Sequence, residues 1–129
     1  RAIIFPDSSV IPAYGYYLIS YFPADSSQIA VVPNLVSKKL QMDRHHLWLK
    51  LFTKNPMDYG AVLIDEAGNG EMPFAGDSLQ FHSMIRVMPP GDGRLPSQWT
   101  TSTTSHGWDP GATEYGTPGA DNTLPVELS

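Results

Sequence analysis

The densest group of side chains that could do chemistry is a set of oxygen donors in the second half of the chain. It consists of Asp65, Glu66, Asn69, Glu71 and Asp77. Calcium binds several carboxylate and amide oxygens from one loop, so these residues are candidate calcium ligands. Their spacing is not that of an EF-hand, and acidic residues beside glycines are also ordinary turn formers. Calcium binding and turn chemistry both stay open.

The four histidines make a weaker case for a metal site. His45 and His46 are adjacent, and neighbouring residues of a strand point to opposite faces, so the pair cannot readily bind one ion. His82 and His106 have no acidic partner at a ligand-like spacing. We expect structural or surface roles for all four.

The motifs of common enzymes are missing from the sequence. There is no cysteine, which excludes a thiol nucleophile, and no Gly-x-Ser-x-Gly elbow. Asp65 and Glu66 are adjacent and would splay to opposite faces of a strand, whereas a hydrolase needs two carboxylates that converge. Gly68–Gly70 and Gly91–Gly93 lack the Lys of a phosphate-binding loop. We therefore predict no enzymatic activity and no cofactor apart from the calcium alternative.

Three tryptophans and one arginine are further candidates. Trp48, Trp99 and Trp108 could form a stacking platform for sugars, although in a small β-domain such residues usually anchor the core. Arg86 follows Ile85 in an expected strand, and its side chain points away from those of its neighbours. We expect a carboxylate, with Asp65 as one conceivable partner, or backbone carbonyls to hold it.

Composition limits the elements that can position these residues. The chain has 129 residues, of which 11 are Gly, 12 are Pro and 16% are charged, and this argues against a helical bundle. With 41% hydrophobic residues the chain can bury a core. The formal net charge of −5 argues against a nucleic-acid partner, and the acidic residues gather after residue 60. We expect one loop-rich β-domain, and the longest apolar run is too short to span a membrane.

The order of apolar and turn residues predicts several strands. A short strand-like run over 3–5 is followed by a turn, and a turn is also expected over 66–70. Residues 35–42 could be a helical turn or an extended segment. From Trp99 the chain is expected to be an irregular tail pinned by aromatic anchors. The expected strands are 16–22, 46–52, 61–65 and 81–87, with 55–60 as a hairpin connection.

Three patterns in this order resemble one family of domains. Residues 5–19 carry a proline-bearing turn before a Gly-aromatic-apolar run, and Gly60–Asp65 is followed by Ser83-Met84-Ile85-Arg86. Trp99 then precedes Gly116-Thr117-Pro118-Gly119-Ala120-Asp121-Asn122. Together they are similar to the lamin-tail family of immunoglobulin-like domains, bacterial type. The resemblance implies an antiparallel β-sandwich over 1–122, with 123–129 as a tail or linker. It also makes Ser83, Arg86, Trp99, Thr117, Pro118, Gly119 and Asn122 a structural motif.

The chain departs from the family at its start. The Trp-Ile-Glu-Leu-x-Asn strand and the Leu-x-Gly-Trp turn that open the family domain have no counterpart here. We expect the N-terminal strands to be supplied by upstream sequence, with Arg1 as an internal cut, or by a partner chain through strand addition.

The resemblance implies a non-catalytic structural or protein-interaction domain outside the cell or on its surface. Such a domain could belong to a homo-oligomer, filament or other surface assembly. The alternative is an accessory domain that binds carbohydrate or calcium beside a secreted enzyme. DNA binding, as in nuclear members of the family, is disfavoured by the acidic second half.

Overall fold

A computed structural model describes residues 2–122; the predicted tail or linker over 123–129 lies outside them. The all-β expectation is confirmed, because the regular elements of the described residues are short strands and two single turns of 3-10 helix. No helix of this part of the chain is long and apolar enough to cross a membrane. The elements in order are β1 (Ile19–Ser20), η1 (Ala24–Ser26), β2 (Leu35–Val36), β3 (Trp48–Phe52), β4 (Leu63–Gly68), β5 (Met84–Arg86), η2 (Pro96–Gln98) and β6 (Trp99–Thr101).

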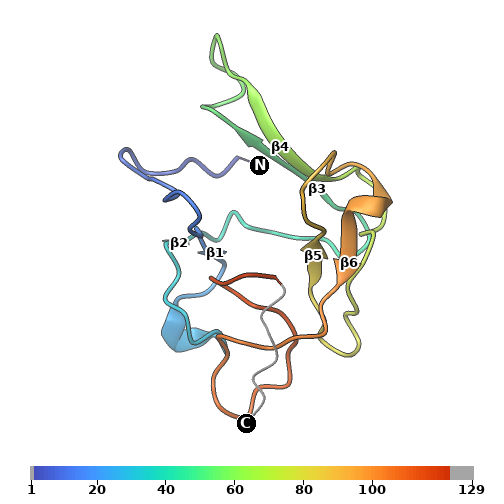
Figure 1. Cartoon of the computed structure of the whole chain (residues 1–129). Helices are drawn as coiled ribbons and strands as arrows, with labels where there is room; N and C mark the ends of the chain where they lie inside the picture. The colour runs from blue at the N-terminus through green and yellow to red at the C-terminus, as the bar shows by residue number, and fades with distance from the viewer. Residues whose placement is uncertain (1, 123–129) are drawn as a thin grey trace.

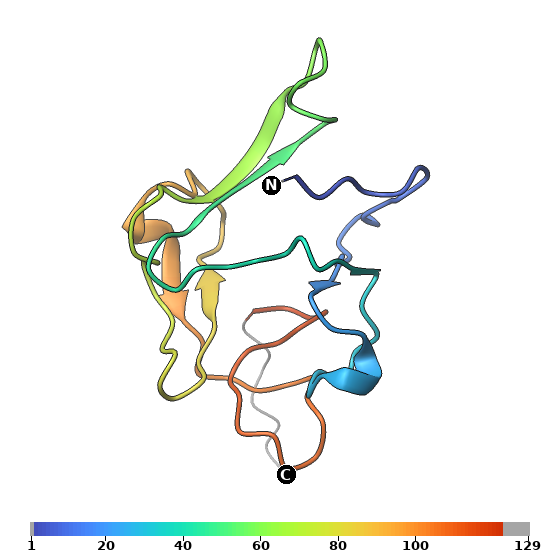
Figure 2. The same ribbon diagram turned by 180° about the vertical axis from the view of Figure 1, so that it is seen from behind.

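The strands form three two-stranded sheets. β3 with β4 and β5 with β6 are antiparallel, as expected, whereas β1 and β2 run parallel with Ile19 opposite Leu35. The β3–β4 hairpin projects from the rest of the molecule, with β5 and β6 beside its base (Figure 1). The view from behind shows β1 and β2 on the far side of the body from β5 and β6 (Figure 2).

The predicted hairpin is confirmed. Its strands pair from Trp48 opposite Gly68 to Phe52 opposite Leu63, and Thr53 N–H donates to Val62 O over 2.9 Å. The register shifts between Leu51 and Phe52, which leaves Ile64 as an extra residue on β4. This bulge therefore lies on β4, and β3 keeps regular alternation.

The turn expected over 66–70 is wrong in its first half. β4 continues to Gly68, because β3 begins at Trp48 and offers partners that far. Gly68 takes a φ of +87°, and a Cβ there would lie 2.2 Å from Leu47 O. Glycine therefore ends the strand where the backbones approach most closely, and the chain turns only after it.

The other expected strands are shortened, and one was missed. The 81–87 strand contracts to β5 because Phe81 has a φ of +62° and lies in the turn that joins Asp77 to His82. β6 lies where an irregular tail was expected, with Trp99 opposite Arg86. Of the 16–22 strand only β1 remains, and the undecided 35–42 segment supplies β2. The run over 3–5 is not a strand, although the turn after it is present, with Ser9 N–H donating to Pro6 O.

Candidate interaction surface

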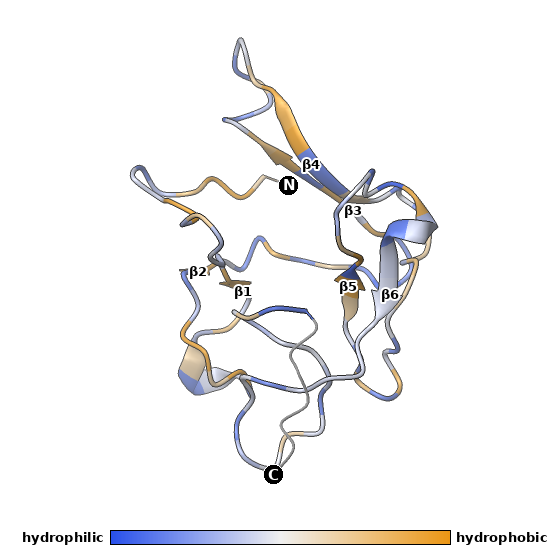
Figure 3. Cartoon of the chain, in the orientation of Figure 1, coloured by the Kyte–Doolittle hydropathy of each residue, from blue (hydrophilic) through white to orange (hydrophobic). Residues whose placement is uncertain are grey.

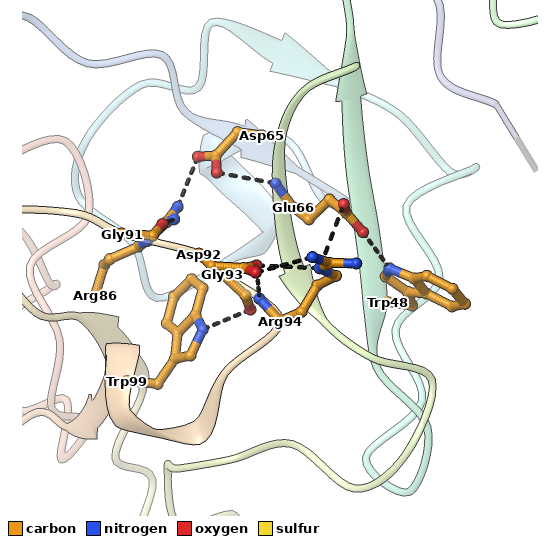
Figure 4. A network of polar contacts seen from close by, with 9 residues as sticks. All are labelled: Trp48, Asp65, Glu66, Arg86, Gly91, Asp92, Gly93, Arg94 and Trp99. Carbon is orange, nitrogen blue, oxygen red and sulfur yellow. Dashed lines mark hydrogen bonds and ion pairs between the residues drawn. The ribbon is translucent and has the colours of Figure 1, made fainter.

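Arg86 holds the base of the hairpin against β5 and β6. From β5, its Nη1 donates to Asp65 Oδ2 on β4 over 2.6 Å, and its Nη2 donates to Gly91 O (Figure 4). Its guanidinium lies 5.2 Å from the centre of the Trp99 ring. The Arg86 side chain is largely buried. The expectation that a carboxylate holds this arginine, with Asp65 as partner, is confirmed.

A second set of polar contacts continues across the base of the hairpin. Trp48 Nε1 donates to Glu66 Oε2 over 2.8 Å, and Arg94 Nε lies 3.9 Å from Glu66 Oε1. Arg94 also binds Asp92, with Nη2 to Oδ2 at 2.9 Å (Figure 4). Hydrogen bonds from the side chain and then the backbone N–H of Arg94 lower the pKa of Asp92 to about 2. The segment 91–94 is thereby tied to β4 through Glu66.

The same segment covers part of the outer edge of β4. Gly68 N–H donates to Gly93 O over 3.0 Å. A Cβ on Gly93 would lie 1.7 Å from Glu66 O, so only glycine permits this approach. Trp99 Nε1 donates to Gly93 O over 2.9 Å and fixes the segment from the other side. The end of β4 near Gly68 is thus covered by backbone.

The Thr-Pro-Gly-Ala part of the predicted structural motif forms a turn near the end of the described chain. Thr117 to Ala120 form a turn in which Ala120 N–H donates to Thr117 O, Pro118 is second and Gly119 takes a φ of +73°. This is the geometry of a type II turn, which favours Pro and then Gly at these positions. Thr117 is buried.

Two further motif residues connect this closing turn to β5. Asn122 Nδ2 donates to Arg86 O over 3.3 Å. Ser83 N–H donates to Tyr115 O, and Ser102 N–H donates to Ser83 O. The closing segment therefore packs against the strand that carries Arg86.

The hairpin beyond this base exposes a large apolar surface. Trp48 is 49% exposed, Met57 89% and Tyr59 99%. Colouring by hydropathy shows apolar residues on β3 and on the outer part of β4, whereas the part of β4 near the base is hydrophilic (Figure 3). We call this the apolar hairpin surface; its side chains are those of Trp48, Leu49, Met57, Tyr59, Val62, Leu63 and Ile64.

The molecule as a whole exposes more surface than a folded monomer of its size. A monomer of this mass exposes about 6,800 Å², whereas this chain exposes 9393 Å². The difference is about 2,600 Å². Leu47, at 5% exposure, is the one apolar side chain larger than alanine that is buried among residues 2–122. The side chains of the apolar hairpin surface are each 40–99% exposed, so this surface has no cover within the described chain.

Four of the five candidate calcium ligands use their side-chain oxygens in other contacts. Asp65 binds Arg86, and Glu66 binds Trp48 and Arg94. Asn69 Oδ1 accepts from Glu71 N–H, while Asp77 Oδ1 accepts from the N–H groups of Leu79 and Gln80. Within residues 2–122, no group of three or more His, Cys, Asp or Glu side chains could hold a metal ion.

The three tryptophans have different surroundings and do not form one stacking platform. Trp99 and Trp108 are half-buried and donate to the carbonyls of Gly93 and Gly116, as anchors do, whereas Trp48 is exposed on the hairpin. Trp108 does line an open depression of about 550 Å³. Its lining includes Tyr21, Phe22, Asp25, Gln28 and Glu114.

The histidines have the structural and surface settings that the sequence indicates. His82 stacks on Tyr115 at 4.1 Å, and its Nδ1 donates to Ser102 O over 2.6 Å. The backbone N–H of His45 donates to Asp43 and, with His46 beside it, lowers the pKa of that carboxyl.

The apolar hairpin surface was not among the sites expected from the sequence. A signal for it was present, because 47–52 is apolar at almost every position rather than at alternate ones. A strand with apolar residues on both faces needs cover on both sides. Lys50, whose Nζ lies 3.9 Å from the Trp48 ring centre, is the polar exception.

Comparison of the chain with protein-family models, with curated protein sequences and with solved structures finds no match in any of the three.

Proposed function

We propose that this chain is a non-catalytic structural or protein-interaction domain whose apolar hairpin surface is covered by a protein partner. The observation that carries the proposal is the exposure of seven large apolar side chains on one hairpin, each 40–99% exposed, within a whole-chain surplus of about 2,600 Å² over a folded monomer. A standard interface removes about 800 Å² from each partner, so the surplus is ample for a stable contact. Exposed apolar patches of this kind mark sites of association.

The finer fold belongs to the same proposal. The strands are part of a lamin-tail-type, immunoglobulin-like sandwich, completed by strands from upstream sequence or from a partner chain. Free strand edges and sparse apolar burial support this. By the resemblance, the domain works outside the cell or at its surface, in an oligomer, filament or other assembly.

Association and surface exposure test the function together. We expect the purified chain to form larger species as its concentration rises, and to bind a hydrophobic fluorescent dye less as it does so. Val62→Thr with Ile64→Thr should weaken association, because both remove exposed apolar area while keeping β-branched shapes. The matched control is Val32→Thr, an isosteric change at an exposed site outside the hairpin.

A clear result would reject the function. A monodisperse monomer that unfolds cooperatively and binds no dye would show that nothing remains to be covered. Equal association of the hairpin variant and the Val32→Thr control would also count against the apolar hairpin surface.

The second candidate is an accessory ligand-binding domain beside a secreted enzyme. The depression beside Trp108 favours carbohydrate, because aromatic rings and acidic or amide side chains line it together. A glycan array tests it, with Phe22→Ala as the variant and Leu79→Ala, also exposed, as the control. Binding that Phe22→Ala alone removes would support a sugar site. Calcium, the other ligand of this candidate, is tested by calorimetric titration, in which no heat and no rise in Tm would remove it.

A further inference from the structure

The two outer edges of the hairpin differ. The outer edge of β4 is met by Gly93, which accepts from Gly68 N–H and lies against Glu66 O, and its strand carries the bulge at Ile64. β3 pairs only with β4 within residues 2–122. Bulges and covering loops are the devices that prevent edge pairing, and both are on β4.

The free edge of β3 has its backbone groups in a defined order. Leu47 N–H donates to Glu71 O and Leu47 O accepts from Gly70 N–H, so Leu47 directs both groups to the β4 side. Thr53 also directs its N–H to the β4 side, where it donates to Val62 O. Because these groups alternate along a strand, Trp48, Lys50 and Phe52 direct theirs outward. Among residues 2–122, no backbone hydrogen bond outside the β3–β4 pairing involves the N–H or C=O groups of Trp48, Lys50 or Phe52.

The side chains of this edge suit a second copy of the same strand. When two copies pair antiparallel about a two-fold axis at Leu49, Lys50 lies opposite Trp48 of the other copy. An ammonium over an indole ring is favourable, and within one chain Lys50 Nζ already lies 3.9 Å from the Trp48 ring centre. An axis at Lys50 would instead place two like charges opposite each other, which destabilises the pair.

We propose that the β3 edge binds the β3 edge of a second copy of this chain, antiparallel and centred on Leu49, to give a four-stranded sheet. The inference rests on the proposed function, since it names the protein that covers part of the apolar hairpin surface. Trp48 and Leu49, both exposed in the single chain, gain cross-strand neighbours from the second copy in the pair. The contact is isologous, as in most homodimers.

Proline at Lys50 separates backbone pairing from side-chain contact. Lys50 N–H points outward, so Lys50→Pro removes an edge donor without removing a β3–β4 hydrogen bond. The matched control, Lys50→Ala, removes the same side chain but keeps the N–H. In sedimentation equilibrium we expect Lys50→Ala to dimerise somewhat more weakly than the parent chain. Lys50→Pro should raise the Kd by about tenfold or more beyond Lys50→Ala, since it loses backbone pairing.

Hydrogen exchange tests the same contact in the unchanged chain. The amides of Trp48, Lys50 and Phe52 should become protected as concentration rises, whereas those of Leu49 and Leu51, which bond β4, should be protected throughout. This measurement stands even if Lys50→Pro fails to fold.

The possible failures separate this inference from the proposed function. Association without added protection at Trp48, Lys50 and Phe52, or equal Kd for the two variants, would overturn the β3 contact while leaving a self-associating domain. A monomer that still binds the hydrophobic dye would overturn the second copy as partner. A monomer that binds no dye would overturn both.

Discussion

Arg86 Nη1 on β5 donates to Asp65 Oδ2 on β4 over 2.6 Å, and this hydrogen bond joins two sheets that share no strand. The Arg86 side chain is 14% exposed and that of Asp65 is 48% exposed. Solvent therefore reaches the carboxylate more easily than the guanidinium, and the two ends of the pair should respond differently to mutation.

We expect Arg86→Ala to destabilise the fold more than Asp65→Asn does. Asp65→Asn removes one charge-assisted bond at a half-exposed site and should cost about 0.5–1 kcal/mol. Arg86→Ala also loses the Gly91 carbonyl contact and the packing on Trp99, and should cost about 2–3 kcal/mol. Urea denaturation of both variants and of the double variant measures the coupling. Additive effects would show that the two side chains act independently.

Gly93→Ala should be among the most damaging single-methyl changes in the chain. A Cβ at this position would lie 1.7 Å from Glu66 O, and backbone on both sides would have to move. We expect a loss of more than about 2 kcal/mol, seen as a Tm lower by about 8 °C. Gly111→Ala is the control, because nothing lies within 4 Å of its Cβ although its φ is +85°. It should cost about 1 kcal/mol through backbone strain alone, and an equal loss at both sites would contradict the steric account.

Trp99→Phe should destabilise the chain by about 1 kcal/mol, because Gly93 O loses a donor at a half-buried site. Trp48→Phe removes an equivalent indole N–H from Glu66, whose side chain is 14% exposed and keeps Arg94 beside it, so we expect a loss of similar size. Thermal unfolding of the two variants side by side gives the comparison. A much smaller loss for Trp48→Phe would show that solvent replaces the lost donor at the Glu66 carboxylate.

Acid should loosen the segment that covers β4 at an unusually low pH. The pKa of Asp92 falls from 3.8 to about 2 on folding, so the folded state binds this proton less well than the unfolded state does. Its contribution to stability is complete above about pH 4 and is lost as pH falls toward 2. Arg94→Gln should raise the pKa of Asp92 part of the way back, because the side-chain hydrogen bond is its largest cause and the backbone N–H remains. Carboxyl carbon NMR titration measures both values, and an unchanged pKa in Arg94→Gln would refute this cause.

Local patterns predicted the hairpin and the anchors because their causes are local. The apolar run before Thr53, the Asn55–Gly60 turn residues and the next apolar run specify a hairpin without further context. The turn over 117–120 is similarly predicted by Pro118 and Gly119, which favour a type II turn at these positions. Arg86 could be matched to an acceptor because a largely buried guanidinium needs a carboxylate or backbone carbonyls to bind.

What the sequence did not predict depends on contacts between distant segments. β6 begins at Trp99, in a polar Thr- and Ser-rich stretch, and is a strand only because β5 lies beside it. Residues 66–68 were predicted to be part of a turn. β4 continues through them because Trp48, Leu49 and Lys50 of β3 supply their partners. The calcium candidates are close in sequence, yet Asp65 and Glu66 do not converge on one site, because Asp65 binds Arg86 and Glu66 binds Trp48.

The bulge at Ile64 makes the two edges of the hairpin unequal in their ability to pair with another strand. Open-ended stacking of the amyloid kind needs each strand to present a pairing edge on both sides, so that every added copy creates a new place for the next. Here an added copy at β3 leaves only two β4 edges, each irregular at Ile64 and blocked near Gly68 by Gly93. The bulge at Ile64 and the backbone contact of Gly93 therefore limit edge pairing to one added copy, because no regular strand edge remains for the next.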